Sequence, residues 1–301
     1  MSTSQSNTNR IAKNTVVLYV RSLIVLLISL YTSRVILQAL GVVDFGIYNV
    51  VGGVISALSF LNWSLQGTYQ RFFNVEMARG GTESISRQFK VANSIQLLMA
   101  LIIVVLAETV GLWFVNTHLV IPADRMIAAN WVYQVTIVSA VISVICSPFG
   151  ALITAYERMD LFAFISIISA LLRLVIVFIV KYTMYDKLVT YSVLLLSVSF
   201  IDWTLYFFLT KRPFPESSIK LMWDRKLMKS MTSFGGWVIV DSLSQMLKGQ
   251  GINIVLNLFF GPVVNSARGI AYQVMNAINQ FISSFQTSFR PQLTKSYAEG
   301  D

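Results

Sequence analysis

The chain has 301 residues, of which 55% are apolar and only 12% are charged, and its formal net charge is +9. Soluble domains carry about twice that share of charged residues. A soluble chain of this length could not keep so much apolar surface from water without exposing large patches. The composition therefore excludes an ordinary soluble enzyme or binding domain and indicates a membrane protein.

The apolar residues fall in blocks of about 20, the length of an α-helix that crosses the hydrocarbon core of a bilayer. A polar segment, 1–15, comes first. The block after it is too long for a signal-peptide core and has no small-residue cleavage site behind it, so we count it as a span. We predict an all-α polytopic membrane protein with eight transmembrane helices, at 16–40, 45–65, 92–115, 127–149, 161–180, 189–209, 234–259 and 266–285.

Lysine and arginine are distributed unequally between the two sides of the predicted bundle. The segments on the N-terminal side hold 15 of the 23 Lys and Arg residues, and the opposite loops hold four. Because cytoplasmic loops carry the excess of positive charge, we expect a cytoplasmic N-terminus. Basic loops beside anionic lipid account for the net charge, so we expect membrane lipids and no nucleic acid as partners.

Residues that commonly perform catalysis or bind metals are scarce. Cys146 is the only cysteine and His118 the only histidine, so an internal disulfide and a His-rich metal site are excluded. The sequence holds no nucleotide-binding, serine-hydrolase or zinc-protease motif, and its outer loops are short. We expect no catalytic residue, no metal and no cofactor, and therefore not an enzyme. A membrane glycan polymerase or ligase would need a larger extramembrane part to hold its substrate and is the weakest alternative.

Two stretches of the chain share one layout. WSLQGTYQRFFNVEMARGG at 63–81 and SSFQTSFRPQLTKSYAEGD at 283–301 each continue an apolar helix with Gln, a small polar pair, an aromatic and a basic segment. A shift of 220 residues aligns 14–81 with 234–301 without a gap, and about 12 of the 68 positions are identical. Six spans separate the copies, so both point the same way, as in the parallel repeats of many transporters.

The repeat predicts how the chain divides into domains. A cytoplasmic segment at 1–15 precedes a six-helix N-terminal lobe at 16–209. A basic cytoplasmic linker at 210–233 then leads to 234–301, the first two helices of a second lobe. We accordingly expect the chain to be a truncated part of a protein with at least 12 spans. The alternative is a complete protein of eight spans.

Ionisable groups inside apolar spans are costly and usually face a bundle interior or water. The predicted seventh and eighth spans add polar stripes at the helical spacing i, i+3, i+4, i+7. We expect a central substrate cavity lined by Arg21, Arg173, Asp241, Gln245, Lys248, Gln273, Asn276 and Gln280. Arg34 lies near the outer end of its span, where its side chain can extend to the headgroups.

The charges suggest two roles within this cavity. Arg binds a diphosphate through paired hydrogen bonds, and Lys binds it as a point charge. Glu108, Asp202 and Asp241 could instead couple transport to H⁺ or Na⁺, and the sequence leaves the ion open. The 220-residue shift places Arg21 and Asp241 at equivalent positions. We therefore consider a charge pair between the lobes, with direct binding of the diphosphate by Arg21 as the alternative.

Three stretches resemble one protein family. They are LQALGVVDFGIYNVVGGVISALSFLNWSLQGTYQRFF, GALITAYERMDLFAFISIISALLRLVIVF and the closing SFRPQLTKSYAEGD. They are similar to oligosaccharide and polysaccharide flippases of the multidrug/oligosaccharidyl-lipid/polysaccharide exporter superfamily. Most of the resemblance is carried by Leu40, Gly41, Phe45, Gly46 and Tyr48 of an LGxxxFGxY turn, and by Pro291 with Ala298, Glu299 and Gly300.

The resemblance implies a fold and a function. It implies two six-helix lobes around a central cavity, working by alternating access. It implies an exporter in the bacterial inner membrane that translocates an undecaprenyl-diphosphate-linked oligosaccharide for surface polysaccharide or lipopolysaccharide, such as O-antigen, with a polysaccharide polymerase as an expected partner. The alternative is a multidrug antiporter of the same superfamily, which should show an acidic, aromatic-lined pocket. Four basic against three acidic residues inside the spans favour an anionic substrate.

Overall fold

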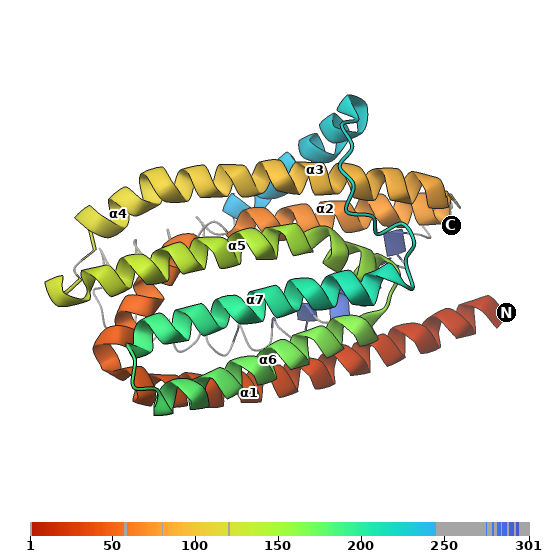
Figure 1. Ribbon diagram of the computed structural model, residues 1–301. Coiled ribbons are helices and arrows are strands. Elements are labelled where there is room, and N and C mark those ends of the chain that lie inside the picture. Colours follow the sequence, from red (N-terminus) through yellow and green to blue (C-terminus); the bar gives the residue numbers. More distant parts are fainter. Residues whose placement is uncertain are drawn as a thin grey trace, which may run out of the picture.

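The structure is a computed structural model that describes residues 2–56, 59–79, 81–119 and 121–244, and isolated positions between 275 and 294. Within these ranges every regular element is helical. The long helices lie side by side with their axes roughly aligned, so that the chain passes back and forth between two ends of a bundle (Figure 1). The predicted all-α fold is confirmed.

The first element, α1 (Ser2–Ser56), is two helices joined at Gly41, where the backbone has φ 78° and ψ 171°. Glycine adopts this positive φ without the steric cost that a Cβ would bring. The chain reverses direction at this point (Figure 1). The glycine of the LGxxxFGxY turn therefore separates the first two passes, as the sequence predicts.

The remaining elements follow with short connections. The third pass is α3, which continues through a π-helix, η1, into α4, and a short 3₁₀-helix, η2, precedes α5. Residues 225–244 are also helical. The elements are α2 (Ser59–Ala78), α3 (Thr82–Leu106), η1 (Ala107–Gly111), α4 (Leu112–Thr117), η2 (Ala123–Arg125), α5 (Met126–Ala155), α6 (Met159–Tyr182) and α7 (Lys187–Lys211).

Five helical stretches of the described residues are long and apolar enough to cross a membrane: Ala12–Gly41, Thr82–Thr117, Ala123–Ala155, Met159–Tyr182 and Lys187–Lys211. They coincide with the predicted first, third, fourth, fifth and sixth spans. The predicted second span is divided between a shorter apolar helix, Val43–Ile55, and α2. The predicted seventh span is described only as far as residue 244, and the eighth lies largely outside the described residues.

The segment 66–91, which hydropathy predicts as a loop, is helical except for a tight turn near Gly81. Tyr69 and Phe73 of α2 and Phe89 of α3 are fully buried in a core at the end of the bundle that holds the α2–α3 turn. Phe89 meets the Phe149 ring edge-on, with ring centroids 5.1 Å apart. Packing of these aromatic side chains extends both helices beyond the apolar stretch, and an average of hydropathy does not detect such packing.

The central helix of the bundle is α5, which contacts α1, α2, α3, α6 and α7. Its apolar stretch is also the most deeply buried of the five. Because helices surround α5, its different faces can line different cavities, and residues of α5 do line two of them.

The predicted inter-lobe linker is closely bound to α3 and to Tyr156 at the end of α5. We call residues 212–224 the strap, because Figure 1 shows this segment running from the end of α7 across α3. Four contacts of the strap hold it: Tyr156 Oη donates to Glu216 Oε1 at 3.1 Å, Asn93 Nδ2 donates to the Ser218 carbonyl at 3.1 Å, Ser94 Oγ bonds both the N–H and the carbonyl of Met222 at 3.0 Å, and Arg87 pairs with Asp224.

Candidate functional site

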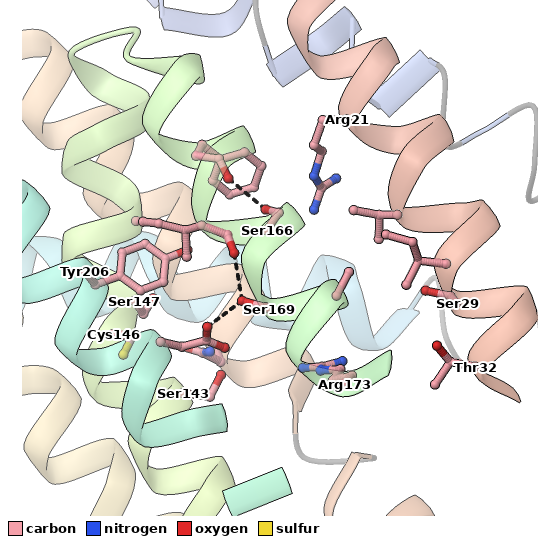
Figure 2. A pocket seen from close by; sticks show the side chains of 18 of the residues that line it. Arg21, Ser29, Thr32, Ser143, Cys146, Ser147, Ser166, Ser169, Arg173 and Tyr206 are labelled. Atoms are coloured by element: carbon pink, nitrogen blue, oxygen red, sulfur yellow. Dashed lines mark hydrogen bonds between the residues drawn. The ribbon is translucent and has the colours of Figure 1, made fainter. Parts of the chain in front are cut away.

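A cavity of about 620 Å³ lies between α1, α2, α5, α6 and α7. Figure 2 shows Arg21, Ser29 and Thr32 approaching it from α1, opposite Ser166 and Ser169 of α6. Pockets that hold small ligands usually measure about 300–1,000 Å³. The cavity is therefore large enough for part of a substrate.

Each wall of the cavity is one helix face. Residues three and four apart share a face, and the lining residues of α5 and α6 keep that spacing. They are Ser143, Cys146, Ser147 and Gly150 on α5, and Phe162, Ile165, Ser166, Ser169, Ala170 and Arg173 on α6. Gly150 allows a close approach across the cavity, because a Cβ there would lie 2.8 Å from Nε2 of Gln66.

Hydroxyl groups dominate the polar lining. Ser166 Oγ donates to the Phe162 carbonyl at 2.8 Å. Ser169 Oγ lies 2.8 Å from the Ile165 carbonyl and also within hydrogen-bonding distance of the Asp202 carboxylate. A hydroxyl has one proton to donate, so Ser169 can turn between a backbone and a carboxylate acceptor. Figure 2 shows both contacts.

Three buried polar atoms of the cavity wall have no hydrogen-bond partner among the described residues: Arg21 Nε, Thr32 Oγ1 and Ser147 Oγ. Buried polar groups in folded proteins nearly always find a partner in protein or ordered water. All three atoms belong to lining residues of one cavity. The arrangement thus presents unused hydrogen-bonding capacity to a polar ligand or to water.

Two guanidinium groups and one carboxylate share the cavity: Arg21, Arg173 and Asp202. The Arg21 guanidinium carbon stands 5.1 Å from the centroid of the Phe162 ring, at cation–π distance. Within the described residues neither arginine forms an ion pair. Arg173 also lines a smaller cavity of about 190 Å³, which reaches Tyr48 after the Gly41 reversal.

The structure brings together some of the residues singled out in the sequence. Arg21, Arg173 and Asp202 all line this cavity. Substrate binding by the two arginines and ion coupling by Asp202 stay predictions. Glu108 lies elsewhere, exposed on the π-helix η1, where Gln134 Nε2 donates to its Oε2 at 3.2 Å. Gln245, Lys248, Gln273, Asn276 and Gln280 lie outside the described residues.

Asp241 is exposed on helix 225–244, which packs along α2. The neighbouring Ser242 Oγ lies 2.9 Å from Ser64 Oγ, and a Cβ on Gly235 would lie 2.9 Å from Leu65 Cδ2. Among the described ion pairs there is none between Asp241 and Arg21. Arg21 faces Phe162 and the cavity instead, which suits direct contact with a ligand.

Sequence reasoning missed the hydroxyl lining of the cavity. It weighed charged residues and two polar stripes near the C-terminus, and left out Thr32, Ser147, Ser166 and Ser169. A signal was present: Ser139, Ser143 and Ser147 recur every four residues in α5, and Ser166, Ser169 and Arg173 follow i, i+3, i+7 in α6. Serine is common in membrane helices as a packing residue, so the spacing alone does not identify a cavity.

Solved structures with the same fold are membrane transporters. An outward-facing multidrug resistance MATE family transporter of the MOP superfamily matches with a TM-score of 0.80 at 13% identity, over 97% of this chain and 65% of that chain. The Vibrio cholerae MATE transporter VcmN in its bent form matches at 0.78 and 13%, over 99% and 68%. A MOP superfamily transporter from Pyrococcus furiosus, described as having a binding pocket of reverse polarity, matches at 0.72 and 13%, over 97% and 65%.

These identities are low, so the matches show the fold. The chain spans about two thirds of the length of these transporters. No individual curated protein matches the chain in a sequence comparison. The model of one protein family, described as polysaccharide biosynthesis protein, matches residues 11–296, nearly the whole chain. The chain is thus a multi-pass membrane protein, and it belongs to the polysaccharide biosynthesis protein family.

Proposed function

We propose that the protein carrying this chain exports a lipid-linked oligosaccharide across the bacterial inner membrane by alternating access. One observation carries the proposal: the cavity combines two guanidinium groups, Arg21 and Arg173, with a wall of hydroxyl and amide side chains. Guanidinium groups bind diphosphate oxygens in pairs. Hydroxyls and amides can exchange hydrogen bonds with the hydroxyls of a sugar. The family match supports a substrate from polysaccharide biosynthesis.

Transport in reconstituted vesicles tests this proposal. The substrate is a fluorescent oligosaccharide on undecaprenyl diphosphate, and the measurement is the rate at which it becomes accessible in the opposite leaflet. Since hydrogen bonds to charged groups contribute about 1.5–3 kcal/mol, we expect Arg21→Ala and Arg173→Ala each to reduce transport about tenfold to hundredfold. Arg34→Ala is the matched control, because Arg34 is exposed on the same helix as Arg21 and does not line the cavity.

If Arg34→Ala reduces transport as much as the two cavity variants do, the cavity is not the binding site. If the wild-type protein moves no lipid-linked sugar but expels organic cations, the second candidate, a multidrug antiporter, is correct. Asp202 favours that candidate, since it places a carboxylate beside Phe162, Tyr191 and Tyr206 in the same cavity.

Asp202 is also our proposed site of coupling to H⁺ or Na⁺, because it is the acidic residue among the described residues that line the cavity and Ser169 is close enough to bond it. Glu108 and Asp241 remain the alternatives. Transport driven by an imposed ion gradient should lose its dependence on that gradient in Asp202→Asn. A polysaccharide polymerase remains the proposed partner protein in the same pathway.

A further inference from the structure

A second cavity, the flank groove, lies between α3, α5 and α7 and measures about 400 Å³. It shares no lining residue with the substrate cavity. On α5, Ile142 and Ile145 face the groove, whereas Ser143 and Ser147 face the substrate cavity. On α7, Phe200 faces the groove, whereas Asp202 faces the substrate cavity. The two helices thus stand between a polar cavity and an apolar groove.

The flank groove opens to the outside of the bundle. Leu97 is 48% exposed and Phe200 is 49% exposed. Both belong to stretches long and apolar enough to cross a membrane. Apolar surface in such a stretch faces hydrocarbon, so the groove lies where a lipid chain can enter it from the bilayer.

The strap forms one end of the groove. Ile219 and Leu221 line it, and the hydrogen bonds of the strap to Asn93 and Ser94 hold them there. The apolar part of α3 begins just after Asn93 and Ser94, so this end of the groove lies near the headgroup level of the membrane. The groove is therefore bounded by a fixed segment of backbone.

Polar and basic groups gather at the same end. Asn93 and Gln96, one turn apart on α3, line the groove, and Gln96 Oε1 is buried without a hydrogen-bond partner among the described residues. Lys220 is exposed and lies between Ile219 and Leu221 in the sequence. Adjacent Cα atoms are about 3.8 Å apart, so its flexible stem can bring the ammonium group to the groove end. Trp203, a residue type enriched at membrane interfaces, lines the groove as well.

We propose that the flank groove binds one anionic phospholipid of the surrounding membrane. One acyl chain lies against α3, α5 and α7, the amides of Asn93 and Gln96 meet the polar glycerol region, and Lys220 attracts the phosphate. Apolar side chains line the groove, two amides lie near its strap end, and an exposed lysine lies in the strap itself, which is the order of groups along a phospholipid. A membrane phospholipid fits better than the chain of the transported substrate, because side chains of α5 and α7 stand between this groove and the substrate cavity. The pair Gln96 Nε2–Asn62 Oδ1, hydrogen-bonded at 3.4 Å between α3 and α2, also stands between them.

The test measures lipid retention and needs no transport assay, so its result is independent of the proposed function. Purified protein is delipidated stepwise in detergent, and the bound phosphatidylglycerol is counted by native mass spectrometry. Leu97→Trp fills the groove, and Leu101→Trp, one turn further along α3 at an exposed position outside the groove, is its control. Lys220→Glu reverses the charge at the groove end, and Lys229→Glu does so at an exposed position outside the strap.

We expect wild type and both controls to retain one phosphatidylglycerol, Leu97→Trp to retain it about tenfold more weakly, and Lys220→Glu about thirtyfold more weakly. Each basic residue near a membrane contributes about 1 kcal/mol toward anionic lipid, and a charge reversal about doubles that effect. Equal retention by Lys220→Glu and Lys229→Glu would overturn the proposal even if Leu97→Trp fails to fold. Preference for phosphatidylcholine, or displacement of phosphatidylglycerol by equimolar undecaprenyl phosphate, would also overturn it.

Discussion

The π-helix η1 depends on a contact between one glycine and one tyrosine. Tyr133 on α5 is fully buried, and its hydroxyl donates to the Ala107 carbonyl at 2.7 Å. A Cβ added to Gly111 would lie 2.1 Å from the Tyr133 oxygen and 3.3 Å from its Cζ. The Tyr133 hydroxyl thus occupies the space that a side chain at position 111 would need, and the wider turn of η1 is fixed against α5.

This contact predicts coupled effects of two substitutions. Tyr133→Phe should lower the free energy of unfolding by about 1 kcal/mol, the net contribution of one hydrogen bond. Gly111→Ala should cost about 1–3 kcal/mol, because it overpacks a close contact. The double variant should cost less than the sum of the two, since removal of the hydroxyl leaves only the 3.3 Å contact with Cζ. Thermal unfolding of the purified protein measures all three.

Gly53→Ala serves as the control for a glycine within a helix, because Gly53 is exposed and, among the described residues, no atom of another segment lies within 4 Å of a Cβ placed there. It should be neutral or stabilising. Strictly additive losses in the Gly111→Ala and Tyr133→Phe pair would show that the two residues do not interact in the folded protein.

At the scale of elements, Arg125 joins three connections at the end of the bundle opposite the N-terminus. Its Nε donates to Asp44 at 2.8 Å, just after the Gly41 reversal, and its Nη1 donates to Asp186 at 2.6 Å. Asp186 also caps α7 by accepting from the Val189 N–H at 3.0 Å. The α1 reversal, the start of α5 and the start of α7 therefore share one guanidinium, which orients three helices at that end.

Arg125→Ala should lower the unfolding temperature of the purified protein measurably, because it leaves two carboxylates close together with no cation between them. Arg158→Ala is the control, since Arg158 pairs with Asp160 two residues away and joins no separate elements. Exposed pairs of that kind contribute about 0–1 kcal/mol. An Arg125→Ala variant no less stable than Arg158→Ala would show that the shared guanidinium does not hold this end together.

The contribution of Asp186 to the free energy of unfolding should depend on pH. Desolvation raises the pKa of its carboxyl group, but hydrogen bonds from Arg125 and from the Val189 N–H outweigh this effect, so the pKa is lowered in the folded protein. The stabilisation is therefore fully present above the unfolded pKa of about 3.9. It is lost as the pH falls through the lowered folded value. In Arg125→Ala this loss should move to higher pH, because the main hydrogen-bond donor is gone.

At the scale of the whole molecule, the connections between helices divide into two groups, one at each end of the bundle (Figure 1). The N-terminus, the α2–α3 turn, the α5–α6 turn and the strap lie at one end of the bundle, and the Gly41 reversal and the α6–α7 connection lie at the other (Figure 1). The excess of Lys and Arg is on the N-terminal side. The positive-inside rule therefore predicts that this end is cytoplasmic.

Single cysteines in a Cys146→Ser background test the orientation. Asp124→Cys and Arg212→Cys replace exposed residues at opposite ends of the bundle. A membrane-impermeant maleimide added to intact cells should modify the first, and should modify the second only after the cells are permeabilised. Modification of Arg212→Cys in intact cells would reverse the orientation and, with it, the proposed direction of export.

The sequence by itself determined the fold class and most of the passes. Burial in a bilayer needs about 20 apolar residues in a row, and that is a local property, so five predicted spans coincide with helices. The Gly41 reversal was predictable for a related reason, because a tight turn favours a residue that tolerates positive φ. Arg21, Arg173 and Asp202 stand out in the sequence because an ionisable residue within a membrane span is conspicuous, and all three line the same cavity.

Only the tertiary structure decided what surrounds those residues. The 620 Å³ cavity takes hydroxyls from helices far apart in the sequence, and Thr32 or Ser147 looks like an ordinary packing residue until five helices are assembled around it. The helical segment beyond residue 65 depends on buried aromatic side chains such as Phe73, and the strap depends on hydrogen bonds to α3. A hydropathy average uses only the residues of one segment, whereas the cavity, the strap contacts and the flank groove depend on which side chains of different segments meet. That information arises only when the helices pack.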